Sequence, residues 1–129
     1  MSTNLRRLNI FEALLRETDN SVRDILAETL RLVASYDFPD EWPDLIPAIV
    51  AQLQTGEVLR VHNAMLALRK VVKRFEYKPK DARGPLLEIM RVTLPLLLNM
   101  SLQLLGEDSS EAGQVLKIAL KVFWSCTQF

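Results

Sequence analysis

Apolar residues recur three or four positions apart along almost the whole chain, and this spacing restricts the folds that the chain can adopt. In the first such stretch, Leu8, Phe11 and Leu15 form one ridge beside Ile10 and Leu14. The strict alternation that is typical of strands is almost absent. Hydrophobic residues make up 49% of the 129 residues and charged residues 25%, which indicates a globular chain rather than a disordered one. We therefore predict an all-α fold.

About six helices are expected, with boundaries set by prolines, glycines and capping residues. Asn20 and Ser21 offer an N-cap for the second helix, with Asp24 in a capping-box position. Pro95 is expected to kink the fifth helix, and Asp108 or Ser109 to cap the sixth. The predicted helices cover residues 5–16, 20–38, 42–54, 57–77, 85–105 and 110–129.

The apolar ridges predict which side of each helix packs. The second helix is expected to pack along Val22, Ile25, Leu26, Thr29 and Val33. The fourth is expected to pack along Val58, Val61, Met65, Leu68, Val72 and Phe75. The sixth is expected to pack along Val115, Ile118, Leu120, Val122 and Phe123.

The segment "SYDFPDEWPDLIP" interrupts this helical pattern with three prolines, three aromatic residues and four acids. Pro39 ends the preceding helix, because the residue before a proline avoids the α region. Pro43 suits the start of the next helix, whereas Pro47 predicts a bent or late-starting helix. Phe38 and Trp42 are expected to fill the gap between helices, so that Phe38, Pro39, Trp42 and Pro43 form a rigid structural corner.

Four acidic residues flank this corner. They are expected either to cap the third helix or to face a basic partner, and capping is the simpler interpretation. These residues are Asp37, Asp40, Glu41 and Asp44.

The predicted helix pairs start near Asn20, Glu57 and Ser110. Their spacing brackets the period of about 40–47 residues of HEAT and armadillo repeats. Periodicity alone leaves two architectures open, an irregular α-solenoid of about three antiparallel helix pairs and a six-helix bundle. Residues 1–129 form a single unit in either case.

Charge is balanced overall, with sixteen basic and sixteen acidic residues, so composition gives no argument for nucleic-acid binding. Locally, residues 57–84 carry eight basic and three acidic residues. These charges indicate either a solvated helix end or a contact surface for an acidic protein partner. The candidate partner-binding residues are Arg69, Lys70, Lys73, Arg74, Lys78 and Lys80, with Arg83 continuing the segment.

Residues that would indicate catalysis do not cluster in the sequence. His62 is the single histidine and has no second ligand at metal-binding spacing. Cys126 is the single cysteine, which excludes an internal disulfide and is expected to be a buried thiol. No glycine-rich phosphate loop, signal peptide or membrane-length apolar run is present. We expect an intracellular, soluble protein that is not an enzyme and uses no cofactor or metal.

Four segments resemble the importin-β superfamily of nuclear transport receptors. "YDFPDEWPDLIPAIVAQL" is similar to a helix-pair corner near the amino end of these receptors. "LALRKVVKRFEYKPKDARGPLLEIMRVTLPLL" resembles a linker of the importin-seven and importin-eight branch, and "NIFEALL" and "VRDILAETLRLVASYDFP" precede it in matching order. Exporters of the superfamily share the corner, so the linker is what favours this branch.

The resemblance implies a HEAT-repeat superhelix, of which this chain would be an N-terminal piece. It implies binding of protein cargo, of Ran in its GTP form and of Phe-Gly nucleoporins during import, with shuttling between cytoplasm and nucleus through the pore. The helices at 42–54 and 85–105 would line the concave surface, and those from Asn20 and Glu57 the convex one. End helices without stacking neighbours would favour self-association.

Two other functions are compatible with the residues themselves. One is a HEAT-repeat scaffold or adaptor that binds a protein unrelated to transport. The other is an autonomous six-helix bundle with a small-molecule pocket, which the long "FEYKPKDARGP" connection disfavours because bundles use short loops.

Overall fold

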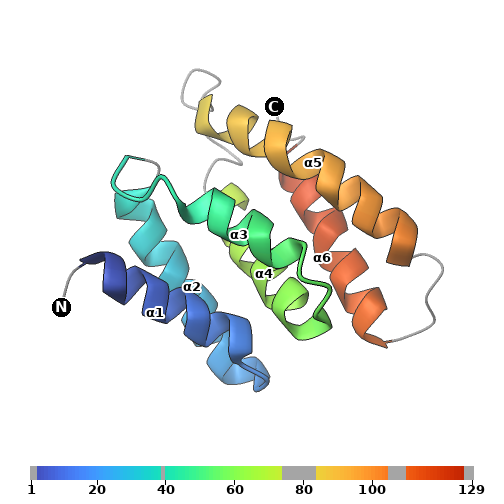
Figure 1. Ribbon diagram of the computed structural model, residues 1–129, viewed down its shortest axis with the longest axis horizontal. Coiled ribbons are helices and arrows are strands. Elements are labelled where there is room, and N and C mark those ends of the chain that lie inside the picture. The colour runs from blue at the N-terminus through green and yellow to red at the C-terminus, as the bar shows by residue number, and fades with distance from the viewer. Residues whose placement is uncertain (1–2, 39, 74–83, 105–109, 127–129) are drawn as a thin grey trace.

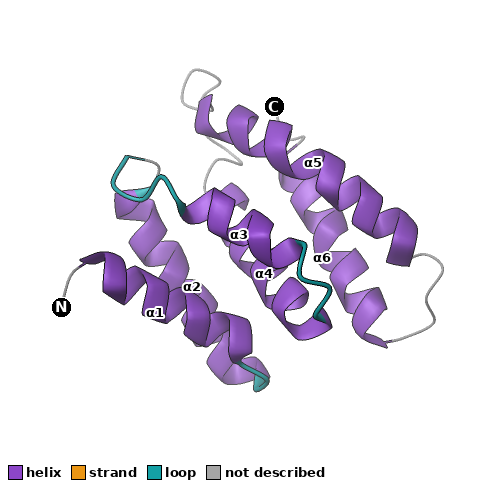
Figure 2. Ribbon diagram, viewed as in Figure 1, coloured by secondary structure: helices purple, strands orange, loops and turns teal. Residues whose placement is uncertain are grey.

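The computed structural model describes residues 3–38, 40–73, 84–104 and 110–126, except for the side chains at positions 3, 4, 101, 104, 111, 112, 123, 125 and 126. All regular structure within these ranges is helical, as predicted (Figure 2). The helices are α1 (Thr3–Arg16), α2 (Asn20–Asp37), α3 (Leu45–Leu53), α4 (Val58–Lys73), α5 (Gly84–Leu104) and α6 (Ser110–Cys126).

The helices form two layers, and successive helices alternate between them (Figure 1). In one layer, α4 packs between α2 and α6. The other layer contains α1, α3 and α5, and covers the first through contacts of α1 with α2 and α4, of α3 with α4, and of α5 with α6. This stack of antiparallel helices confirms the predicted HEAT-like α-solenoid. The helices α3 and α5, which correspond to the predicted helices 42–54 and 85–105, lie in the same layer.

The pairing of helices differs from the expected pair starts. The closest contacts between consecutive helices are α1 with α2, α3 with α4, and α5 with α6. Short turns join the first two pairs, which forces antiparallel packing of the helices that they connect. These pairs begin at Thr3, Leu45 and Gly84, a spacing of about 40 residues that is more regular than the predicted one.

Asp19, rather than Asn20 or Ser21, caps the second helix. Its backbone is extended, and its Oδ1 accepts a hydrogen bond of 3.0 Å from the Val22 amide. Both predicted caps already have helical backbones, and Asp24 is an exposed residue within the helix. The predicted N-cap is therefore one or two residues too late, and the predicted capping box of Ser21 and Asp24 is wrong. The predicted sixth-helix caps lie outside the described residues.

The packed face of α2 was also predicted wrongly. Val22 and Ile25 are exposed, whereas Leu26 and Val33 lie partly buried at the edge of the core. The actual face combines small side chains, which let α2 approach its neighbours closely, with one arginine whose hydrogen bonds allow its burial. The residues of this face are Arg23, Ala27, Leu30 and Ala34.

Two further apolar residues lie outside the core that the ridges predicted. Val58 is 48% exposed because it is the first residue of α4, and Leu120 is 60% exposed. In α6 the buried positions follow a single ridge of three- and four-residue steps, and Leu120 lies off this ridge. The ridge is Val115, Ile118, Ala119 and Val122. Phe75 and the side chain of Phe123 lie outside the described residues.

The prolines act only partly as predicted, because Pro43, which was expected at the start of the third helix, lies before its N-cap residue Asp44 and outside the helix. The third helix starts late, at Leu45, so Pro47 occupies its first turn, where no intrahelical amide bond is lost. Pro95 lies inside α5, and the helix continues past it. Gly56 takes a left-handed backbone, with φ of 79°, in the turn between α3 and α4, which a residue with a Cβ would adopt only with strain.

The corner between α2 and α3 is buried on its aromatic side. Phe38 and Trp42 are each 6% exposed and belong to the core, as predicted. Pro43 is exposed, and Pro39 lies outside the described residues. The aromatic rings therefore fill the space between the helices, while Pro43 faces outward.

A buried arginine from α1 holds this corner. Arg7 donates from Nε and Nη2 to Asp37 Oδ2, at 3.0 and 2.8 Å, and from Nη1 to the carbonyl of Glu41, at 2.7 Å. Its guanidinium also lies 5.7 Å from the centre of the Trp42 ring, within the range of a cation–π contact. The corner is thus fixed by one cation as well as by apolar packing.

We predict that Trp42→Ala lowers the free energy of unfolding by about 3–5 kcal/mol, because it leaves a cavity in the core and removes the ring beneath Arg7. Urea unfolding at neutral pH measures this change. Tyr36→Ala is the matched control, since Tyr36 is 86% exposed and its loss should change the value by less than about 0.5 kcal/mol. A loss below about 1 kcal/mol for Trp42→Ala would show that the corner is not a packed wedge.

Candidate partner-binding surfaces

The basic segment is only partly a free surface. Lys70 Nζ lies 2.9 Å from Glu28 Oε2, which joins α4 to α2. Arg69 is half-buried, and its Nε is buried without a hydrogen-bond partner. Lys73 is exposed. Among the described members of this segment, the structure therefore leaves Lys73 as the most open cation, while Arg74, Lys78, Lys80 and Arg83 lie outside the described residues.

Glu28, the partner of Lys70, also pairs with a second cation. Glu28 contacts Arg31 Nη2 at 2.6 Å, so it lies between cations from α2 and α4. The pKa of Glu28 lies below its usual value because Lys70 and then Arg31 hydrogen-bond its carboxylate. Sequence reasoning missed this role of Lys70, since its partner lies 42 residues away.

The acidic residues of the corner divide into two groups. Asp37 is held by Arg7, a partner that sequence reasoning did not find. Asp40, Glu41 and Asp44 are exposed. Asp44 occupies the N-cap position of α3, but its side chain makes no capping hydrogen bond, so the predicted capping role is wrong for this carboxylate. These exposed carboxylates remain available to solvent or to a partner.

An apolar groove of about 620 Å³ opens between the corner, α3 and α5. One side consists of the corner and α3, and the other consists of the first half of α5. Glu88, at the α5 side, pairs with Arg91. The lining residues are Phe38, Pro43, Ile46, Pro47, Val50, Ala51, Gln54, Pro85, Glu88, Ile89 and Val92.

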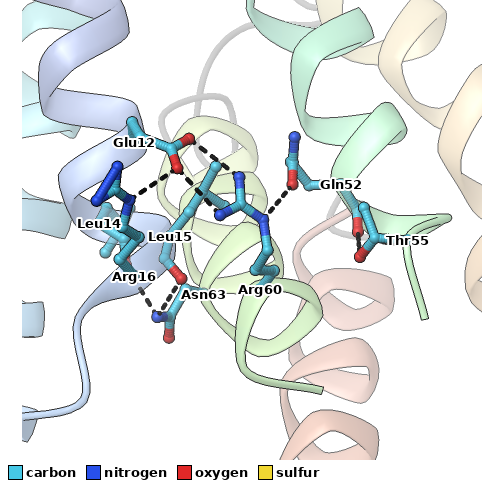
Figure 3. A network of polar contacts seen from close by, with 8 residues as sticks. All are labelled: Glu12, Leu14, Leu15, Arg16, Gln52, Thr55, Arg60 and Asn63. Atoms are coloured by element: carbon cyan, nitrogen blue, oxygen red, sulfur yellow. Dashed lines mark hydrogen bonds and ion pairs between the residues drawn. The ribbon is translucent and has the colours of Figure 1, made fainter. Parts of the chain in front are cut away.

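A polar network ties α1 to α3 and α4 (Figure 3). Arg60 donates from both terminal nitrogens to Glu12, each at 3.0 Å, and from Nε to Gln52 Oε1 at 2.9 Å. The pKa of Glu12 is lowered chiefly by its hydrogen bond with Arg60. Arg16 also donates to Glu12. The hydrogen bonds of Arg60 link three helices within the protein, which indicates a structural role.

Asn63 completes the contact between α1 and α4. Its fully buried Nδ2 donates to the carbonyls of Leu14, Leu15 and Glu17, at 2.8, 3.2 and 2.9 Å. These carbonyls lie in the last turn of α1 and directly after it, where helical amide donors run out. The carbonyl of Leu14 also accepts a hydrogen bond of 3.2 Å from the Glu17 amide. Asn63 therefore caps α1 from a neighbouring helix, and no local signal in "RVHNAM" indicates this.

His62 is a half-buried packing residue. Its Nδ1 lies 2.9 Å from Nη1 of Arg23. An arginine can only donate, so Nδ1 accepts the bond and the ring carries its proton on Nε2. Burial, and then the charge of Arg23, lower the pKa of His62 below its usual 6.5. The structure thus favours a neutral imidazole.

We predict that stability falls on mild acidification because of His62. Above pH 6.5 the neutral ring keeps its bond to Arg23. Below that pH the unfolded chain binds a proton more readily than the folded chain, so stability is lost as the pH falls through the lowered folded pKa. Urea unfolding at pH 7.5, 6.5 and 5.5 measures the trend.

His62→Asn keeps an acceptor near the place of Nδ1 but cannot titrate, so it should flatten this dependence. An equal loss of stability in both proteins between pH 7.5 and 5.5 would show that another group is responsible.

Neither a metal centre nor a membrane span is found in the described part of the chain. No group of three or more histidine, cysteine or acidic side chains there is arranged to hold a metal ion. None of the helices described is long and apolar enough to cross a bilayer. The side chain of Cys126 lies outside the described residues.

Comparison with known proteins identifies relatives along almost the whole chain. Mouse importin-8 is 35% identical over 123 residues, and human importin-8 is 33% identical over the same number; each alignment covers 95% of this chain and 12% of the relative. The importin beta-like SAD2 homolog of Arabidopsis thaliana is 30% identical over 103 residues, 78% of this chain and 10% of that protein.

No family model and no solved structure matches the chain. The assignment therefore depends on the curated relatives, of which this chain spans about one-eighth of the length. Their alignments include the corner, the groove and the Arg60 network, because they cover 95% of the chain. On this similarity, and with a fold of alternating helical layers, the chain belongs to the importin-β family.

Proposed function

We propose that this chain is part of a nuclear transport receptor and that it contributes to binding protein cargo, Phe-Gly nucleoporins and Ran in its GTP form during import. The observation that carries the proposal is the similarity to importin-8 over 95% of the chain. The chain would form one section of a longer superhelix that shuttles between cytoplasm and nucleus through the pore.

The two helical layers supply two different faces for these partners. The layer of α1, α3 and α5 carries the apolar groove and the exposed carboxylates of the corner, features that suit protein cargo. The layer of α2, α4 and α6 packs side by side, and the seam between α2 and α4 is a candidate site for nucleoporin phenylalanines. Exposed apolar residues such as Val22 and Ile25 lie on α2.

The helix contacts also suit a receptor that bends. Each helix packs only on near neighbours, so small changes at successive interfaces add up along a superhelix. Binding of Ran in its GTP form would shift this ensemble toward a shape that holds cargo less well. The polar contacts Arg7–Asp37 and Arg60–Glu12 keep this section rigid while neighbouring sections move.

A segment exchange tests the proposal. The 123 matching residues of mouse importin-8 are replaced by this chain, and the chimera is applied to immobilised Phe-Gly repeats and to Ran loaded with a non-hydrolysable GTP analogue. We expect binding to both within about threefold of intact importin-8, a change of less than 1 kcal/mol. Importin-8 lacking the segment is the negative control, and Ran loaded with GDP tests the nucleotide dependence.

A chimera that is folded by circular dichroism but binds neither partner would contradict the proposal. The chain would then be a HEAT-repeat scaffold or adaptor for a protein unrelated to transport.

A further inference from the structure

Helices α4 and α6 carry several cations that no carboxylate of the described residues neutralises. α4 has four basic residues and no acidic one, and α6 has two basic residues and one acidic one. On α4, Arg60 is bound by Glu12 and Lys70 by Glu28. The other four cations make no ion pair within the described part of the chain. We call them the cationic patch: Arg69, Lys73, Lys117 and Lys121.

The two cations on α4 lie on its open side, next to α6. α4 packs between α2 and α6. Lys70 reaches Glu28 of α2, and Val71 is buried, so Arg69 lies on the other flank of Lys70, toward solvent and α6. Lys73 is exposed and shares this face, because residues four apart on a helix lie one above the other.

The two cations on α6 open onto the same side of the molecule. Lys117 and Lys121 are exposed, share one face of α6 and lie away from its buried ridge. α4 and α6 pack side by side, and the layer of α1, α3 and α5 covers their other side (Figure 1). The exposed faces of the two helices therefore meet in one surface, with two cations on each helix.

The cationic patch concentrates positive charge in a small area. Residues four apart are separated by about 6 Å along a helix axis, and packed helices lie about 8–10 Å apart. Arg69 is also half-buried, and its Nε is buried without a hydrogen-bond partner among the described residues. Its guanidinium is therefore partly withdrawn from water, which strengthens its attraction to an anion.

The spacing of these cations favours clustered phosphates over carboxylates. An extended acidic peptide places one side chain about every 6.8 Å on one side, so it would follow a single row of cations. A phosphate monoester carries a charge of about −1.5 to −2 and three acceptor oxygens, and several on one small molecule reach both rows. The planar fork of Arg69 also matches the oxygens of a phosphate.

We propose that the cationic patch binds a compact, soluble ligand that carries several phosphate groups, of the class of the inositol polyphosphates. The ligand lies across the line where α4 and α6 meet, with Arg69 and Lys73 on one side and Lys117 and Lys121 on the other. This goes beyond the proposed transport function and does not depend on it, because it follows from the charges of two helices.

Isothermal titration calorimetry of the 129-residue chain with inositol hexakisphosphate at neutral pH tests the site. Hexaglutamate is the matched carboxylate ligand and should bind at least about tenfold more weakly. Phosphatidylcholine vesicles with and without phosphatidylinositol bisphosphate test a lipid source of the same chemistry. Because the ligand that we propose is soluble, both kinds of vesicle should sediment the same amount of the chain.

Charge-matched variants locate the site on the protein. Lys73→Gln combined with Lys121→Gln removes one exposed cation from each helix and should weaken binding of inositol hexakisphosphate by about tenfold or more. Arg6→Gln combined with Arg16→Gln removes the same charge from exposed positions of α1 and should weaken it by less than about twofold. Glutamine is a good helix former, and circular dichroism checks that both variants are folded.

Four results would overturn the inference. The first is no measurable binding of inositol hexakisphosphate by the parent chain. The second is equal weakening by the two double variants, which would show that binding follows net charge. The third is equally tight binding of hexaglutamate, which would make the patch a surface for acidic protein segments. The fourth is stronger sedimentation with the bisphosphate vesicles, which would assign the patch to a membrane surface.

Discussion

The structure depends most on one buried cation, Arg7 of α1. A buried guanidinium is costly unless its donors are satisfied, and here three hydrogen bonds to Asp37 and Glu41 and the face of Trp42 satisfy it. These partners all come from the end of α2 and the corner that follows. One side chain therefore fixes α1 against the corner and fixes the path by which the chain leaves α2.

The path of the corner determines what lies beyond it. Trp42 and Phe38 close the core on one side, and Pro47 fits only because α3 starts late, at Leu45. The short α3 then lies in the same layer as α5 without closing against it, and Pro43 and Phe38 form part of the groove between them. The same corner thus seals the core and shapes the surface that we propose for partner binding.

The local features of the fold were predictable from the sequence, whereas the contacts between distant residues were not. Apolar spacing and the prolines predicted the six helices, the late start of α3 and the burial of Phe38 and Trp42. The packed face of α2 was predicted wrongly because it includes Arg23, whose buried guanidinium bonds His62, 39 residues away, as well as the Thr18 carbonyl. The basic segment was read as one surface, but Lys70 is bound by Glu28 on another helix. The groove had no sequence signal, because it arises from the distance between two helices.

A double-mutant cycle of Arg7→Met and Asp37→Ala tests the central claim most directly. The free energy of unfolding is measured by urea titration for the parent, both single variants and the double variant. If Arg7 holds the corner, the two changes are strongly coupled, by about 1.5–3 kcal/mol, as expected for hydrogen bonds between charged groups. Additive effects, with coupling below about 0.5 kcal/mol, would show that apolar packing alone fixes the corner and would contradict this account.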